Sequence, residues 1–347
     1  MYIKKILLAV VLIGLVVAGF IAYKIYQTMF VSNTAFNNDT AYIYIPTNAN
    51  YNEVREQLEP LLKDVDKFDA LARQKHYVTN IKAGKFAIKK GMNNNDIINS
   101  IRSNNIPVKL SFNNQESLAN LAGRVSVQIE ADSLELMTVM SSPEFLKANN
   151  FSPQTALGMY IPNSYQFFWN TSAEQFRERM LKEYNRFWTE ERLAKAEAIN
   201  LTPDQVMTLA SIVQKETAKV DERKRVAGVY MNRLKVRMPL QADPTVIYAI
   251  KHSSQNFDQI IKRVLYKDLV IDSPYNTYKY AGLPPGLITM PDISSIDAVL
   301  NYEHHDYYYF VADVKNFGYH KFAKSLSQHN VNRQEYVKWI SQQGVNR

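Results

Sequence analysis

Residues 202–218 read Thr-Pro-Asp-Gln-Val-Met-Thr-Leu-Ala-Ser-Ile-Val-Gln-Lys-Glu-Thr-Ala, and this stretch predicts a helix that packs against a core. Thr202 precedes Pro203, and Gln205 stands three residues after Thr202, a pattern typical of a capping box with proline at the first helical position. Apolar residues then recur at helical spacing: Val206, Leu209, Ala210, Val213 and Val220. The pattern therefore predicts one apolar face on this helix.

Glu216 lies at the border of that apolar face, next to Leu209, whereas Lys215 and Lys219 point away from it. Partial burial would raise the pKa of its carboxyl, so that part of it stays protonated near neutral pH and can donate a proton. The alternative is an ordinary surface glutamate on an amphipathic helix. Spacing alone does not distinguish the two interpretations.

The composition limits the class of protein. The chain has 347 residues, of which 46% are hydrophobic, enough for two compact domains with separate cores. It has no cysteine, which excludes disulfides, thiolate metal sites and a cysteine nucleophile. The net charge of +8 suits an anionic partner such as membrane lipid or a cell-wall polymer. Nucleic acid is not expected, because the basic residues are scattered among acids and no nucleic-acid motif occurs.

The N-terminus contains an uninterrupted apolar run, Ile6–Tyr23, which spans roughly 27 Å as a helix and would cross a bilayer. A cleaved signal peptide is the alternative, but no convincing cleavage site follows. Lys4 and Lys5 outweigh Lys24, so the positive-inside rule predicts a cytoplasmic N-terminus. We therefore expect residues 1–5 in the cytoplasm, a single-pass anchor at 6–23, a polar spacer at 24–40, and the remaining chain outside the cytoplasmic membrane.

Beyond the spacer, the patterns predict an α+β protein with two parts. Residues 41–130 form one or two small α/β modules, and residues 131–347 form a larger mixed α+β domain that carries the helix of Glu216. Expected strands lie at 42–45, 83–92, 107–112, 307–312 and around Phe322, and expected helices at 51–62, 95–101, 132–148, through most of 172–234, and from about Arg333.

Two loop segments carry candidate binding residues. Tyr275, Asn276, Thr277 and Tyr278 offer ring faces, hydroxyls and an amide, the groups needed to hold an N-acetylated sugar, although a packed surface loop is the alternative. Gln241 and Asp243 occupy alternate positions of an extended segment. Asp243 either caps the helix that Pro244 opens or faces a cleft as a second carboxylate, as a two-acid glycosidase requires.

Other chemistries find little support in the sequence. His304 and His305 are adjacent and would diverge on a strand, His320 and His329 lie too far apart for a local pair, and neither HExxH nor HxH occurs. The G-x-S-x-G motif of serine hydrolases is also missing. We expect no metal and no cofactor.

Several motifs together resemble those of the membrane-bound endolytic murein transglycosylases of the YceG-like (MltG) family. They are Leu209-Ala-Ser-Ile-Val-Gln-Lys-Glu-Thr, Val229-Tyr-Met-Asn-Arg-Leu, Leu240-Gln-Ala-Asp-Pro-Thr-Val-Ile-Tyr, Ser273-Pro-Tyr-Asn-Thr-Tyr, Ala281-Gly-Leu-Pro-Pro-Gly, Gly318-Tyr-His-Lys-Phe and Gln328-His-Asn330. The resemblance runs from the anchor almost to the C-terminus. Residues 83–104 resemble the N-terminal LysM-like module of the family.

The resemblance places the single catalytic glutamate of the family on Glu216, and its groove motifs on Gln241, Asp243, Tyr275, Asn276 and Tyr278. It implies cleavage of the β-1,4 bond between N-acetylmuramic acid and N-acetylglucosamine to give 1,6-anhydro ends, with peptidoglycan strands and the membrane as partners. It also implies a role in ending strand elongation near the synthesis machinery. A hydrolytic muramidase that uses Asp243, or a non-catalytic peptidoglycan-binding protein, remains open.

Overall fold

The computed structural model describes residues 2–342, which divide into two compact units of mixed α+β structure. Unit 1 contains the described residues up to Leu110 with Val127–Ala131 and Tyr165–Ser172, and unit 2 contains Ser111–Ser126, Asp132–Ser164 and the described residues from Ala173 onward. Strands β3 (Pro107–Phe112) and β4 (Asn163–Phe168) form a two-stranded sheet, and both contribute residues to both units. The boundary predicted at residues 130 and 131 falls where the chain passes between the units, and it stays a prediction.

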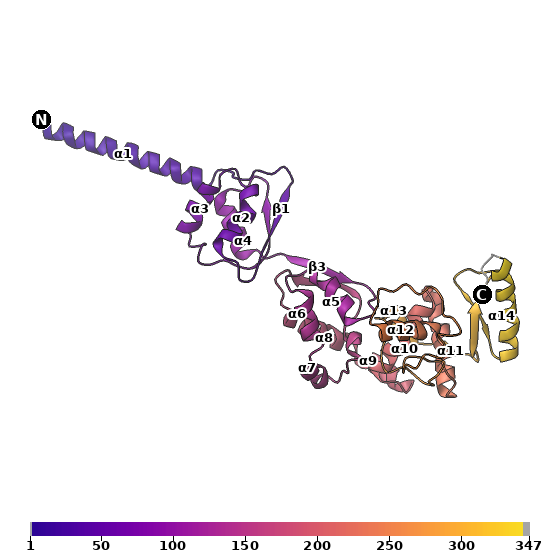
Figure 1. Cartoon of the computed structure of the whole chain (residues 1–347). Helices are drawn as coiled ribbons and strands as arrows, with labels where there is room; N and C mark the ends of the chain where they lie inside the picture. The colour runs from indigo at the N-terminus through magenta and orange to yellow at the C-terminus, as the bar shows by residue number, and fades with distance from the viewer. Residues whose placement is uncertain (1, 343–347) are drawn as a thin grey trace. The chain divides into compact units, whose positions relative to one another are not determined.

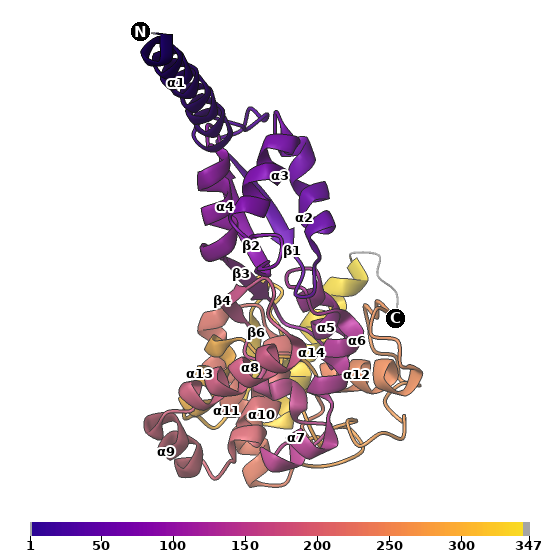
Figure 2. The same ribbon diagram turned by 90° about the vertical axis from the view of Figure 1, so that its left-hand side faces the viewer.

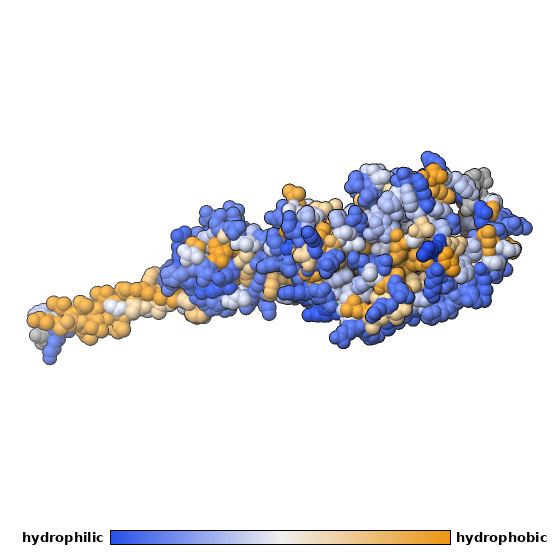
Figure 3. Space-filling view, turned by 90° about the horizontal axis from the view of Figure 1, so that it is seen from below, coloured by the Kyte–Doolittle hydropathy of each residue, from blue (hydrophilic) through white to orange (hydrophobic). Residues whose placement is uncertain are grey.

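Helix α1 (Tyr2–Met29) opens unit 1 and contains the whole predicted apolar run (Figure 1). Among the described residues it is the one helix long and apolar enough to cross a membrane, with a mean hydropathy of 2.9, and none of it is buried. Figure 3 shows its apolar side chains as a continuous rod. The helix is thus compatible with membrane anchoring by length and composition.

The predicted spacer at 24–40 needs correction, because these residues are helical or docked. Helix α1 continues to Met29, and the side chains of Asn33 and Thr34 are buried. The Asn33 amide donates to the Asp64 carbonyl and to Asn94 Oδ1, both at 2.7 Å, while Thr34 Oγ1 accepts from the Gly91 amide at 2.8 Å. Polar residues can be buried at little cost when every group is hydrogen-bonded, which composition does not reveal.

A two-stranded antiparallel sheet and three helices form the core of unit 1 (Figure 2). Strand β1 (Thr40–Ile45) pairs with β2 (Gly84–Lys89), and Tyr44 lies opposite Lys85. Between them come α2 (Tyr51–Leu58), the 3₁₀ turn η1 (Glu59–Leu61) and α3 (Val65–Gln74), and α4 (Asn94–Ser103) follows β2. Alternate strand residues face this core, as period-two alternation predicts: Ile43, Ile45, Phe86 and Ile88 are buried against the helices.

Unit 2 is mainly helical. Its first helices are α5 (Leu118–Ser126), α6 (Ser133–Met140), α7 (Pro143–Ala148), α8 (Ala173–Phe187) and α9 (Glu190–Ala198), with the 3₁₀ turn η2 (Ala156–Met159) before β4. The helix expected at 132–148 is split in two, because Ser142 caps a new helix that Pro143 opens. Strand β4, in an aromatic segment near residue 165, is not among the strands expected from the sequence.

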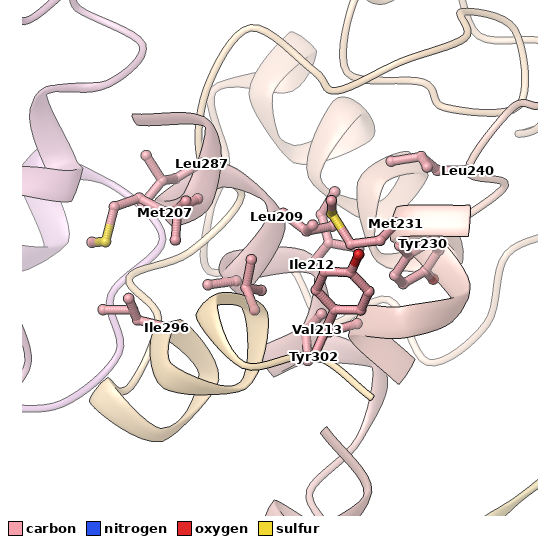
Figure 4. Close-up of a cluster of buried hydrophobic side chains, with 14 of the residues drawn as sticks. Met207, Leu209, Ile212, Val213, Tyr230, Met231, Leu240, Leu287, Ile296 and Tyr302 are labelled. Carbon is pink, nitrogen blue, oxygen red and sulfur yellow. The ribbon is translucent and has the colours of Figure 1, made fainter. Parts of the chain in front are cut away.

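Helix α10 (Pro203–Glu216) lies at the centre of unit 2, and its predicted start is confirmed. Thr202 caps it, with the reciprocal Gln205 bond of a capping box and Pro203 in the first turn. Every residue from Val206 to Val213 is buried, so the helix is covered on all sides rather than on one face. Figure 4 shows Met207, Leu209, Ile212 and Val213 of this helix within the buried apolar cluster. Val220 does not belong to it: α10 ends at Glu216, and Val220 is 59% exposed in the 3₁₀ turn η3 (Val220–Glu222).

The helices α11 (Arg223–Lys235), α12 (Asp243–Ser254) and α13 (Ile293–Leu300) pack around α10. A hairpin of β5 (Tyr309–Ala312) and β6 (His320–Ala323) turns at Gly318, whose φ of 84° suits glycine, and α14 (Leu326–Gln342) packs against it. Helix α14 begins before the predicted start at about Arg333. The loop before α13 passes so close to Gln154 that a side chain at Gly286 would meet its carbonyl oxygen at 2.1 Å.

Candidate active site

Glu216 is the last residue of α10, where the buried helix reaches a pocket of about 330 Å³. Its carboxylate oxygen Oε1 accepts a hydrogen bond of 2.6 Å from the hydroxyl of Tyr230 on α11. Tyr230 is buried, so its ring and hydroxyl are fixed by the core. The structure thus holds Glu216 in one orientation at the pocket surface.

The surroundings of Glu216 favour its protonated form. Burial raises the pKa of Glu216 to about 7, and the hydrogen bond from Tyr230 and the nearby His320 only partly oppose this effect. The negative charge of Asp243 adds to the increase. A carboxyl with a pKa near neutrality can donate a proton and later accept one, which is the property expected of a general acid and base.

Asp243 lies in the same pocket as Glu216 and does not cap its helix. It is the first residue of α12, whose N-cap position is Ala242, and no side chain caps that end. Instead, Asp243 Oδ1 accepts a hydrogen bond of 2.6 Å from the hydroxyl of Tyr278. The capping interpretation is therefore wrong, and the pocket contains two carboxylates, each bound by a tyrosine hydroxyl.

Gln241 and Tyr278 also line the pocket, but three other predicted binding residues do not. Tyr275, Asn276 and Thr277 are all at most 3% exposed. The Asn276 amide donates to the carbonyls of Leu269 and Ile271, both at 2.9 Å.

The buried loop residues fix the segments that reach the pocket. The Thr277 carbonyl accepts from the Gln241 amide at 3.1 Å, and its hydroxyl accepts from the Ala242 amide at 3.0 Å. The ring of Tyr275 packs on Tyr248, with centroids 4.6 Å apart. These contacts support the backbone that carries Gln241 and Tyr278, rather than offering groups to a ligand.

The C-terminal hairpin and α14 supply pocket residues that the sequence did not reveal. Four residues that come later in the chain than Glu216 and Asp243 line the same pocket: Tyr309, Phe310, His320 and His329. The ring of His329 stacks on Tyr309 at 5.3 Å, and burial, followed by the nearby Arg233, lowers the pKa of His329. The only sequence signal was the motif around residues 318–330, which carried no indication of its spatial neighbours.

His320 is tied to the segment after α10 through Glu222. Its Nδ1 lies 2.8 Å from Glu222 Oε2, and its backbone amide donates to Glu222 Oε1 at 2.7 Å. Burial works against ionisation of Glu222, but these bonds and one from the Thr217 hydroxyl outweigh it and lower the Glu222 pKa. A buried, ionised Glu222 therefore holds the hairpin beside Glu216.

Arg233 joins three segments of the pocket wall. Its guanidinium is almost fully buried and donates to the carbonyls of Tyr308 at 2.6 Å and Leu240 at 2.7 Å. Burial lowers the Arg233 pKa, as expected for a charge removed from water. Within residues 2–342, no group of three or more His, Cys, Asp or Glu side chains is placed to hold a metal ion.

Comparison with known proteins gives one consistent result. The model of the YceG-like family matches residues 43–335. A protein named endolytic murein transglycosylase, from Bacillus subtilis (strain 168), is 29% identical over 318 residues, which cover 86% of this chain and 85% of that relative.

A longer protein of the same name, from Streptococcus pneumoniae serotype 2 (strain D39 / NCTC 7466), is 29% identical over 323 residues. The match covers 84% of this chain but 58% of that relative. A crystal structure of a YceG-like protein from Listeria monocytogenes superposes with a TM-score of 0.56 at 30% identity, over 85% of this chain and 99% of that one.

Proposed function

The chain belongs to the YceG-like family, and on that premise we propose that it is an endolytic murein transglycosylase whose acid and base is Glu216. The reaction is cleavage of the β-1,4 bond between N-acetylmuramic acid and N-acetylglucosamine within a glycan strand. The relatives named for this activity support it over most of the chain. The observation that carries the assignment of the residue is a single glutamate with a pKa of about 7, aimed into a polar and aromatic pocket.

The proposed mechanism needs one carboxyl group in two protonation states. Protonated Glu216 donates its proton to the bridging oxygen as the C1–O bond breaks, and N-acetylglucosamine leaves with a free hydroxyl. The resulting carboxylate then takes the proton of the C6 hydroxyl of the same muramic acid. The C6 oxygen attacks C1 and closes a 1,6-anhydro ring, so atoms and charge balance without water. Because nucleophile and electrophile belong to one sugar, the effective concentration is high.

The pocket offers a role for each neighbouring residue. The Tyr230 hydroxyl binds Oε1 of Glu216, which leaves Oε2 to carry the proton toward the substrate. Asp243, held by Tyr278, supplies negative charge that favours the protonated acid and a developing positive charge at C1. Gln241 is exposed at the rim and can position an acetamido group. Tyr275, Asn276 and Thr277 act by holding this loop.

The hydrolytic alternative would use Asp243 as a second catalytic carboxylate, and the two mechanisms leave different products. Mass spectrometry of fragments released from purified peptidoglycan distinguishes them. The proposed reaction gives internal fragments one water lighter than reducing sugars, and Glu216→Gln abolishes their release. Glu197→Gln, a matched change at an exposed position of α9, leaves release intact. Reducing ends, or full activity of Glu216→Gln, would contradict the proposal.

The anchor would place this chemistry at the outer face of the cytoplasmic membrane. We infer that residues 1–5 are cytoplasmic and that the single-pass helix holds the catalytic part, proposed as residues 131–347, close to newly made strands. A LysM-like module within residues 41–130 and contacts with the peptidoglycan synthesis machinery complete this proposal. The role that follows is to end the elongation of nascent strands.

The absence of native cysteine gives a direct test of this topology. Ser254→Cys introduces one exposed thiol at the end of α12. In intact spheroplasts, a membrane-impermeant maleimide should label this thiol, whereas a cysteine placed at Lys4 should react only after lysis. The opposite pattern would invert the orientation.

A further inference from the structure

The outer face of the β1–β2 sheet in unit 1 is not covered by helices. The inward residues of both strands pack on α2, α3 and α4, whereas Tyr42 and Tyr44 on β1 point outward and are 51% and 39% exposed. On β2 the same outward face carries Lys85 opposite Tyr44 and Lys89 opposite Thr40. The outward strand residues include no acid.

The aromatic rings and the lysine on this face contact one another. Lys85 Nζ lies 4.3 Å from the centroid of the Tyr42 ring and 5.7 Å from that of Tyr44. The ring of Trp169, which also belongs to unit 1, meets Tyr44 edge-on, with centroids 5.3 Å apart at 66°. Cation–π contacts of this kind fix a lysine above an aromatic surface while its ammonium group remains accessible.

The contact between Tyr44 and Trp169 borders a hollow of about 450 Å³ within unit 1. Its lining combines apolar and cationic groups and contains no carboxylate: Tyr44, Lys85, Pro107, Val108, Lys109, Val127, Gln128 and Trp169. Val127 is 76% exposed at the edge. We call Tyr42, Tyr44, Lys85, Lys109 and Trp169 the aromatic–lysine face.

Single exposed aromatics are ordinary on a protein surface, but this face differs in two ways. The rings of Tyr44 and Trp169 are in contact and Lys85 joins Tyr44 to Tyr42, and two lysines flank these rings without acidic neighbours on the sheet face or in the hollow. A contiguous apolar patch with charge of one sign marks an interaction surface. Its chemistry requires a ligand that has flat apolar faces and negative charges.

We propose that the aromatic–lysine face binds a carboxylate-bearing peptidoglycan strand, at a site built entirely from unit 1 and separate from the pocket of Glu216. This inference rests on the proposed function for the identity of the polymer. The C–H faces of the pyranose rings stack on Tyr44 and Trp169, and Lys85 and Lys109 pair with carboxylates of the peptides that the muramic acids bear. The face takes no part in the chemistry, so it acts on the binding of polymer rather than on bond cleavage.

The intrinsic fluorescence of Trp169 provides a direct measurement at this face. The detergent-solubilised full chain with Glu216→Gln is titrated with soluble disaccharide-peptide fragments of peptidoglycan. We expect a change in tryptophan emission that disappears in Trp169→Phe, because the other tryptophans, Trp188 and Trp339, lie in unit 2. The double variant Tyr44→Ala/Lys85→Ala, made in the same background, should bind at least about tenfold more weakly, equivalent to about 1.4 kcal/mol.

Matched controls keep the result specific to this face. Tyr266→Ala/Lys267→Ala removes the same two residue types from an exposed position in unit 2 and should leave binding unchanged. Lys109 is exposed and lies outside the β1–β2 sheet. The substitution Lys109→Ala should therefore weaken binding without affecting the fold. Uncharged N-acetylglucosamine oligomers should bind more weakly than the carboxylated fragments, because they lack partners for both lysines.

Two outcomes would overturn the proposal: unchanged affinity in both face variants, or a Trp169 response to phosphatidylglycerol vesicles with none to the glycan fragments. Failure of the proposed function would be seen in a different measurement, because the wild-type chain would then release no anhydro products. In chains that keep Glu216, Tyr44→Ala/Lys85→Ala should leave the rate of cleavage of short soluble glycans equal to that of the wild type. On intact peptidoglycan, the same double substitution with Glu216 intact should raise the KM.

Discussion

The unusual pKa of Glu216 should lower the stability of the protein at alkaline pH. Its folded-state pKa of about 7 lies above the ordinary value of 4.5. The carboxyl therefore contributes stability that is fully present below about pH 4.5 and is lost as pH rises through about 7. At roughly 1.4 kcal/mol per pKa unit, the loss is about 3 kcal/mol, and this is an upper value because Glu216 is partly exposed.

Glu216→Gln removes this loss, because an amide does not titrate and can still accept the hydrogen bond from Tyr230. We expect both proteins to have similar stability near pH 4.5 and the variant to be more stable by up to about 3 kcal/mol at pH 8. For a unit of this size the difference corresponds to about 6–12 °C in Tm. Thermal unfolding at pH 4.5, 6, 7 and 8, followed by circular dichroism, measures it.

The comparison needs a control that keeps all other titrating groups. Glu197→Gln, at an exposed position of α9, changes the same atoms and should follow the wild-type curve at every pH. Parallel curves for the wild type and Glu216→Gln would refute the reasoning, since the carboxyl would then ionise equally easily in both states. The assignment of Glu216 as a general acid near neutral pH would lose its physical basis.

Three further outcomes follow from the contacts. In Tyr230→Phe the Glu216 carboxylate loses a hydrogen bond worth about 1.5–3 kcal/mol, so the Glu216 pKa rises. The alkaline fall in kcat/KM should therefore move up by at least about one pH unit, and an unmoved profile would contradict this. Asp243→Asn removes a charge that raises the Glu216 pKa, so the same fall should move to lower pH while anhydro products persist, whereas a hydrolase would be inactivated. Gly228→Ala places a Cβ 2.3 Å from a backbone carbonyl and should destabilise by about 1–3 kcal/mol in denaturant titrations, while Gly123→Ala, with open space around it, should not.

Local chemistry made the central helix predictable. The hydrogen bonds of Thr202 and Gln205, and the position of Pro203, depend on residues within four places of one another, so the sequence contains them in full. The position of Glu216 at the end of that helix follows from the same pattern. Strand β3 was predicted at its observed bounds, because its alternation and the preceding Pro107 are also local signals.

The remainder of the site depends on contacts between distant segments. His320 is held beside Glu216 by Glu222, and Arg233 is held there by the carbonyls of Tyr308 and Leu240; no local pattern encodes those contacts. Asn276 has the right residue type for a sugar contact, yet its amide is consumed by two buried carbonyls. Burial of this kind is a property of the assembled unit. The buried Asn33, which composition assigned to a spacer, illustrates the same limit.

Digestion of peptidoglycan in water enriched with oxygen-18 tests the central claim, that the C6 hydroxyl and not water attacks C1. The account predicts that the wild-type chain releases fragments with anhydro ends that carry no oxygen-18, and that Glu216→Gln releases none. Products with oxygen-18 at a new reducing end, formed in place of anhydro ends, would show that water is the nucleophile and would contradict the account.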